Sequence, residues 1–197
     1  MTVHYITGND TDRSIMIKIT NRTMKYDYDC GPASVSILLS AYGVHYKPDH
    51  LIKIFKSTRK NGTPWRAMKS FLRELNLFKI EENHSFSRAK SFLRKPTPLL
   101  ICWNVFGNPE YSHYSVIIQM DDEKVTILDP EDWKKFTEHE LTEFKKYWRP
   151  YHYWSVSLVS DKRKRIMKTF PGEVRTDERG DLDISKVQNW IRKAKKN

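Results

Sequence analysis

Length, composition and charge limit what this chain can be. With 197 residues, 39% of them hydrophobic, the chain can bury one sizeable core, so one domain with an appended tail is expected. Two cysteines are too few for a disulfide scaffold or a four-ligand zinc site, no run of about 18 apolar residues predicts a membrane span, and the polar N-terminus is unlike a signal peptide. We therefore expect a soluble, cytoplasmic protein with free thiols and no metal or cofactor.

Basic residues outnumber acidic ones by 35 to 24, which gives a net charge of +11. The last 37 residues hold 12 basic and 6 acidic side chains and so account for +6 of that total. An excess of this kind favours an anionic partner such as nucleic acid or a lipid surface. The competing interpretation is that much of the charge, which lies at helical spacing between residues 47 and 95, only covers solvated helix faces.

The first part of the chain is predicted to be helical after a short N-terminal extension, residues 1–23. In that extension, isoleucines at every second position between 15 and 19 would line one side of a strand. Residues 31–42 place apolar side chains at i, i+3, i+4 and i+7, which predicts a helix, and Gly43 follows as a stop.

Further helices are predicted at residues 48–56, from Pro64 onward and at 85–93. Thr63 is expected to cap the helix that begins at Pro64. That helix would bury four apolar residues, Met68, Phe71, Leu72 and Leu75.

From residue 99 the periodicity changes. Short runs rich in Val, Ile and aromatic residues, separated by turns, predict strands of an antiparallel sheet at 99–103, 114–120, 124–128 and 153–159. Helices followed by strands indicate an α+β architecture with segregated layers. We expect one domain over residues 24–160 and a basic C-terminal appendage over 161–197.

Cys30 lies at the predicted start of a helix. A cysteine is a nucleophile as a thiolate, and a helix N-terminus favours that form through its dipole and free N–H groups. A small buried cysteine is the ordinary alternative. Cys30, between Asp29 and Gly31, does not lie in an apolar run, whereas Cys102 does and is expected to be structural.

A histidine and a carboxylate are placed to assist this thiol. His113 precedes one predicted strand and Asp129 ends the next, so a hairpin through residues 121–123 would bring the two side chains together. His113 would then be the general base, and Asp129 the group that orients it. An Asp before Pro130 that only ends a strand is the alternative for Asp129. The other histidines show no metal-ligand spacing.

These residues resemble the C39-like peptidase family, whose domains have the papain-like fold. The family carries an Asp-Cys-Gly-Pro/Ala nucleophile motif, a His that opens a strand and an Asp-Pro about sixteen residues later, and here residues 29–32, His113 and 129–130 match them. The resemblance covers residues 24–160 and implies a cysteine peptidase with a Cys-His-Asp triad. Other positions that look like the family are Tyr42, Gly43, Gly62, Thr63, 133–137, Glu140, Leu141 and Phe144.

The sequence departs from the family at the oxyanion hole. The family usually has a glutamine five or six residues before the cysteine, and here Met24 and Lys25 stand at those places. The backbone N–H of Cys30 is expected to be one donor. Four side chains are candidates for the second donor: Asn21, Lys25, Tyr26 and Tyr28.

Three functions remain in competition. The first is hydrolysis of a peptide or isopeptide bond in a polypeptide substrate through a thioester intermediate. The second uses the same triad for side-chain amide hydrolysis or acyl transfer. The third is a catalytically weakened fold that binds an anionic or protein partner through the basic tail.

Overall fold

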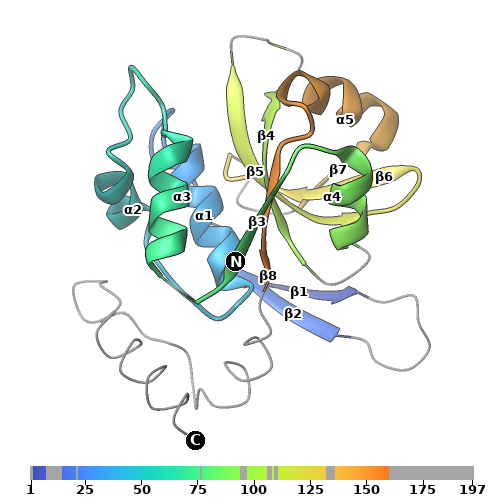
Figure 1. Cartoon of the computed structure of the whole chain (residues 1–197), viewed down its shortest axis with the longest axis horizontal. Coiled ribbons are helices and arrows are strands. Elements are labelled where there is room, and N and C mark those ends of the chain that lie inside the picture. Colours follow the sequence, from blue (N-terminus) through green and yellow to red (C-terminus); the bar gives the residue numbers. More distant parts are fainter. Residues whose placement is uncertain are drawn as a thin grey trace, which may run out of the picture.

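The computed structural model describes residues 2–7, 15–20, 22–75, 77–93, 97–105, 108, 111–131 and 136–159. Three helices stand on one side of a six-stranded antiparallel sheet, and two further helices stand on the other (Figure 1). This arrangement is the α+β architecture that the order of helices and strands predicted.

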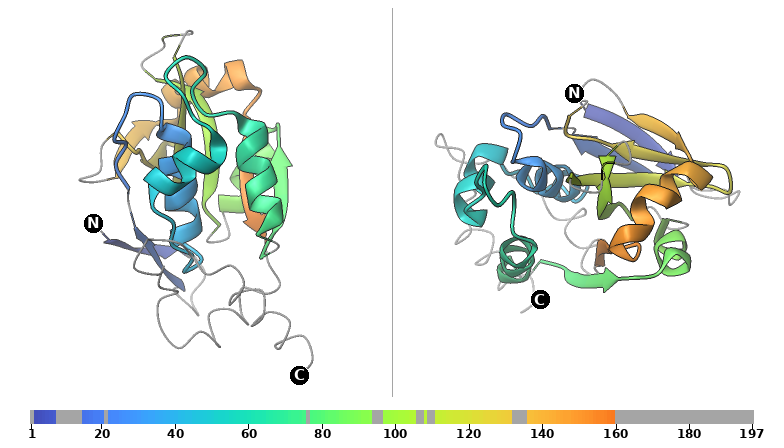
Figure 2. Two further views of the ribbon diagram at one scale, coloured as in Figure 1. Left: turned by 90° about the vertical axis from the view of Figure 1, so that its left-hand side faces the viewer. Right: turned by 90° about the horizontal axis from the view of Figure 1, so that it is seen from above.

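The first three helices are α1 (Cys30–Ser40), α2 (Pro48–Phe55) and α3 (Trp65–Glu74). They confirm the helices predicted from apolar spacing. Every residue of α1 is buried, because α2 and α3 cover it on one side and the sheet covers it on the other (Figure 2). Gly43, with φ of 73°, takes the left-handed conformation that lets the chain turn after α1.

The predicted cap of α3 is wrong in its detail. The N-cap is Pro64 and makes no side-chain capping bond. The Thr63 hydroxyl instead donates to the carbonyl oxygen of Tyr28 at 3.2 Å and shares a 2.9 Å hydrogen bond with the Ser57 hydroxyl. Thr63 therefore ties the start of α3 to the segment that precedes α1.

The sheet has the order β3-β8-β4-β5-β6-β7, and every neighbouring pair is antiparallel. The central β5 pairs with β4 on one side and with β6 on the other. The predicted hairpin is confirmed, since Asp121 donates its N–H to the Lys124 carbonyl at 3.0 Å. The strands are β3 (Lys79–Asn83), β4 (Leu99–Asn104), β5 (Ser112–Met120), β6 (Lys124–Leu128), β7 (Thr137–Glu140) and β8 (Ser155–Val159).

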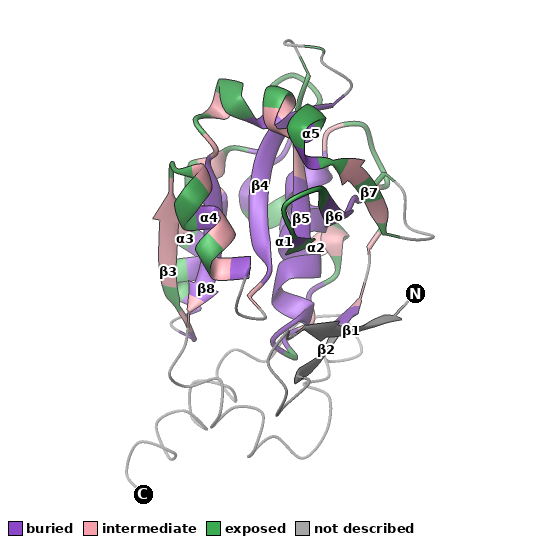
Figure 3. Cartoon of the chain, turned by 90° about the vertical axis from the view of Figure 1, so that its right-hand side faces the viewer, coloured by how far each residue is buried: buried purple, intermediate pink, exposed green. Residues whose placement is uncertain are grey.

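Each face of the sheet has its own hydrophobic core. One core joins α1, α2 and α3 to side chains such as Leu100, Val116 and Val156. The other packs α4 (Phe86–Leu93) and α5 (Leu141–Trp148) on the opposite face. A short 3₁₀ helix, η2 (Arg149–Tyr151), follows α5. Figure 3 shows that β4, β5 and α1 are mostly buried, whereas the edge strands β3 and β7 are not.

A separate two-stranded sheet, β1 (Thr2–Thr7) and β2 (Ile15–Thr20), precedes the helices. It contains the strand predicted at 15–19. Ile19 is buried in the core under α1, and the Thr20 N–H donates to the Ser40 hydroxyl at 2.8 Å. The basic appendage predicted at 161–197 lies outside the described residues.

Hydrophobic periodicity did not predict β1, β3, β7, α5 or the short η2. The two strands β3 and β7 explain why. Both strands lie at sheet edges and are rich in polar residues, so they lack the alternating apolar side chains of a half-buried strand. None of the helices in the described ranges is both long and apolar enough to cross a lipid bilayer.

Candidate active site

Cys30 is the first residue of α1, and its side chain is buried with only 8% exposed. The preceding Asp29 is the N-cap residue of α1, but its side chain makes no capping hydrogen bond. Its carboxylate instead accepts the backbone N–H groups of Lys25 at 3.0 Å and Tyr26 at 3.3 Å, which folds the preceding loop against the helix start. Burial raises the pKa of Asp29, although these N–H groups oppose the change.

Gly31 allows a close contact beside Cys30. A Cβ at this position would lie 2.6 Å from both the Cβ and the Cγ2 of Thr63, which is closer than any two such carbons can approach. The loop before α3 therefore packs directly on the backbone of the first turn of α1. Glycine is required here by a close approach and not by an unusual backbone conformation.

His113 and Asp129 meet at the adjoining ends of β5 and β6. Nε2 of His113 lies 2.8 Å from Oδ1 of Asp129, and the His113 side chain is completely buried. Burial lowers the pKa of His113, but the interactions with Asp129 and with Cys30 outweigh it and raise the pKa to about 10. The thiol, the imidazole and the carboxylate therefore form one interacting group.

The Asp129 carboxylate has further donors. Oδ1 also accepts the N–H of Glu131 at 2.8 Å, and Oδ2 accepts the hydroxyl of Ser115 at 2.9 Å. Burial alone would raise the pKa of Asp129, but His113, the Glu131 N–H and Ser115 together lower it. The carboxylate stays ionised, so Nε2 of His113 is the nitrogen that donates to it.

That bond leaves Nδ1 of His113 for Cys30. Nδ1 is buried and has no hydrogen-bond partner of acceptable geometry in the described ranges. Cys30 is among the groups that raise the pKa of His113, so the thiol and the imidazole interact. A thiol, a base and an oriented carboxylate in this order suit nucleophilic attack on an acyl carbon.

Tyr111 covers one side of the histidine. Its ring stacks on the imidazole with centroids 6.2 Å apart and planes 15° from parallel, and its hydroxyl donates to Glu131 at 3.3 Å. The side chain is 37% exposed. Burial, helped by the charges of Glu131 and Cys30, raises the pKa of Tyr111 to about 12.

The predicted oxyanion-hole side chains lie in the loop before Cys30. Lys25 forms an ion pair with Asp49 at 3.4 Å and lies over the Tyr26 ring at 5.4 Å. The Tyr26 ring in turn stacks on Tyr28 at 5.2 Å. Asn21 lies outside the described residues.

The second cysteine behaves as expected for a structural residue. Cys102 lies in β4 and is 8% exposed. Burial, with a smaller contribution from the charge of Cys30, raises its pKa to about 12. Within the described ranges, no group of His, Cys, Asp and Glu side chains could hold a metal ion.

Sequence reasoning missed the residues that support Asp129. Ser115 and Trp103 lie on the same face of the sheet as His113. Ser115 is two residues further along β5, and Trp103 of β4 is directly opposite His113 in the β4–β5 pairing. The sequence did offer one signal for Ser115: it is a polar residue in an apolar strand, two positions after the histidine, and so on the same face.

Comparison with known proteins identifies the family of this chain. Residues 19–154 match the model of the Peptidase C39 family, and the chain belongs to that family of cysteine peptidases. The matched residues include Cys30, His113 and Asp129.

One curated relative is the pediocin PA-1 transport/processing ATP-binding protein PedD of Pediococcus acidilactici. It is 29% identical over 120 residues, which are 61% of this chain and 16% of the relative. The chain therefore spans a small part of that relative's length.

Two solved structures share the fold, which is the papain-like fold expected from the resemblance. The peptidase domain of Streptococcus ComA, a bifunctional ABC transporter involved in quorum sensing, is 19% identical with a TM-score of 0.59, covering 71% of this chain and 97% of that one. A double glycine motif protease from an AMS/PCAT transporter, in complex with its leader peptide, is 16% identical with a TM-score of 0.57, covering 73% and 94%.

Proposed function

We propose that this chain hydrolyses a peptide bond with Cys30 as nucleophile, His113 as general base and Asp129 as the orienting group. The observation that supports these roles is the buried His113, which is bound through Nε2 to Asp129 and has Nδ1 left for Cys30. Membership of a cysteine peptidase family agrees with the same assignment.

The reaction would run in two acyl-transfer steps. With its pKa raised to about 10, His113 already holds the proton taken from the Cys30 thiol as an imidazolium, and the thiolate attacks the carbonyl carbon. The imidazolium then gives its proton to the leaving amine as the C–N bond breaks, which leaves a thioester on Cys30. In the second step His113 removes a proton from water, the resulting hydroxide attacks the thioester, and the carboxylic acid and thiol are released.

Asp129 would stabilise the imidazolium in both steps. The ionised carboxylate holds Nε2–H at 2.8 Å, which keeps Nδ1 directed to the reacting atoms. The backbone N–H of Cys30, at the N-terminus of α1, is one proposed oxyanion donor, and Lys25 or Tyr26 is proposed as the second. The same triad could serve amide hydrolysis or acyl transfer, and substrate trials separate these reactions.

The proposed substrate is a polypeptide with a glycine pair before the scissile bond. This proposal rests on two relatives, one described as a pediocin processing protein and the other as a double glycine motif protease with its leader peptide. The test is cleavage of a synthetic peptide containing Gly-Gly, followed by mass spectrometry, with the wild type and Cys30→Ala, His113→Ala and Asp129→Asn. Cleavage by the wild type, lost in Cys30→Ala and His113→Ala, supports the proposal; equal cleavage by Cys30→Ala overturns it.

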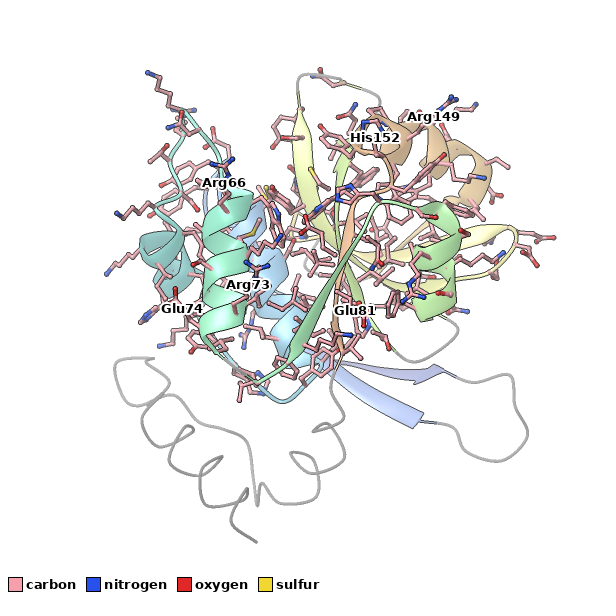
Figure 4. The ribbon with its side chains drawn as sticks, in the orientation of Figure 1. Arg66, Arg73, Glu74, Glu81, Arg149 and His152 are labelled. Carbon is pink, nitrogen blue, oxygen red and sulfur yellow. The ribbon has the colours of Figure 1, made fainter. Side chains whose placement is uncertain are left out.

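A second candidate function is binding without turnover, which is favoured by Met24 in place of the family's glutamine. The proposed anionic partner would bind the tail at 161–197. In the described part of the chain, exposed basic residues such as Arg66 and Arg73 on α3 and Arg149 beyond α5 are spread over both sides of the molecule (Figure 4). Biological activity retained in Cys30→Ala and lost at high salt would favour this function.

A further inference from the structure

A buried chain of hydrogen bonds runs from β4 to the carboxylate of Asp129. Nε1–H of Trp103 donates to the Ser115 hydroxyl at 2.9 Å, and that hydroxyl donates to Oδ2 of Asp129 at 2.9 Å. Ser115 is 0% exposed and Trp103 is 3% exposed, so water does not compete for either bond.

The direction of this chain is fixed by chemistry. An indole nitrogen is only a donor, so the Ser115 oxygen must accept from Trp103. The hydroxyl has one proton, and the acceptor beside it is the ionised carboxylate. The Ser115 hydroxyl can therefore only donate to Oδ2 of Asp129. The N–H of Trp103 prevents the hydroxyl proton from rotating toward the indole.

The carboxylate is consequently held at both oxygens. Oδ2 accepts a hydrogen bond from the Ser115 hydroxyl. Oδ1 accepts one from Nε2–H of His113 and one from the backbone N–H of Glu131, each at 2.8 Å. A carboxylate held on one side only could rotate about its terminal torsion, which has a broad energy profile. Rotation would move Oδ1 away from Nε2 of His113.

We propose that Ser115, oriented by Trp103, is a positioning residue that fixes the Asp129 carboxylate, and through it His113, for catalysis. This inference rests on the proposed function of the triad. It adds two residues that act through Asp129 and do not touch the substrate.

Ser115→Ala is the direct test. It should leave KM unchanged, lower kcat about tenfold, and move the acid limb of the kcat/KM profile to higher pH by about one unit, because a charge-assisted donor to the carboxylate is lost. Ser115→Cys, which keeps a weak donor of similar size, should lie between Ala and wild type. The matched control is Ser36→Ala, since Ser36 is a buried serine whose hydroxyl donates to the Tyr46 carbonyl.

Trp103→Phe tests the orienting step. It should move the acid limb of the kcat/KM profile to higher pH, by less than Ser115→Ala does. The double variant Trp103→Phe/Ser115→Ala should show the same shift as Ser115→Ala alone. Trp148→Phe is the control, because Trp148 is a buried indole on the same face of the sheet whose N–H donates to the Trp154 carbonyl at 3.0 Å.

A measurement without substrate separates this inference from the proposed function. The ¹³C NMR titration of the Asp129 carboxyl carbon should show its midpoint about one pH unit higher in Ser115→Ala than in wild type or Ser36→Ala. An unchanged midpoint and an unchanged acid limb overturn the inference even if Cys30→Ala abolishes cleavage. A shifted midpoint in a protein that cleaves nothing supports the positioning of Asp129 and counts against the proposed function alone.

Discussion

The backbone N–H of Met24 donates to the carbonyl oxygen of Pro130 at 2.9 Å, so the residue six places before Cys30 is fixed beside the loop that follows Asp129. The resemblance to the C39 family expects a glutamine at this place or the next. The methionine side chain has no N–H to offer an oxyanion, and the backbone N–H of Met24 is already bonded to Pro130.

Met24→Gln should therefore increase activity. Loss of one oxyanion-hole donor typically costs about a hundredfold to a thousandfold in rate, so a restored side-chain amide should raise the rate of hydrolysis of p-nitrophenyl acetate by about tenfold or more. Met24→Leu, which offers no donor, is the control and should leave the rate near that of the wild type. A rate in Met24→Gln no higher than in Met24→Leu would mean that the proposed donor, Lys25 or Tyr26, already fills this role completely.

Gly31→Ala should destabilise the fold beside the nucleophile. The added carbon would lie 2.6 Å from the Thr63 side chain, and overpacking of this kind costs typically about 1–3 kcal/mol in the free energy of unfolding. Urea unfolding measures the loss. The double variant Gly31→Ala/Thr63→Gly removes the opposing side chain. In it, the loss in the free energy of unfolding should be smaller than the sum of the losses in the two single variants. Losses that simply add would argue against the contact.

The sequence predicted the elements whose apolar residues recur at a regular spacing. The helix after Cys30 and the β5–β6 hairpin follow from spacing, which is why His113 and Asp129 could be expected at adjoining strand ends. Ser115 could not be assigned, since its role depends on Trp103 in a strand that is adjacent in space but separate in sequence. The edge strands β3 and β7 escaped prediction because their stability comes from pairing with β8 and β6 and not from their own side chains.

Glu82 should be important for stability because it accepts two indole N–H groups. Nε1 of Trp65 donates to it at 3.2 Å and Nε1 of Trp154 at 2.9 Å, and Lys69 forms an ion pair with the same carboxylate. Glu82→Ala leaves these partly buried donors without an acceptor and should cost about 1–3 kcal/mol in the free energy of unfolding. The exposed Glu74 provides the control, and an equal effect of Glu74→Ala on the unfolding curve would contradict this role.

Stability should fall on the alkaline side through His113. Its pKa is raised to about 10 from an ordinary value near 6.5, so its contribution is fully present below about pH 6.5 and is lost as the pH rises through about 10. The midpoint of urea unfolding should drop between these values in the wild type. The drop should be smaller in His113→Gln, with the exposed His84→Gln as the control, and equal drops in all three proteins would exclude His113 as the cause.

The reactivity of Cys30 with iodoacetamide, followed across pH by mass spectrometry, tests the central claim most directly. An interaction between Cys30 and His113 predicts rapid alkylation of Cys30 at neutral pH, a much slower reaction in His113→Ala, and little reaction at the buried Cys102, whose pKa is about 12. Equal alkylation of Cys30 in the wild type and in His113→Ala would contradict the claim that this pair forms a catalytic centre.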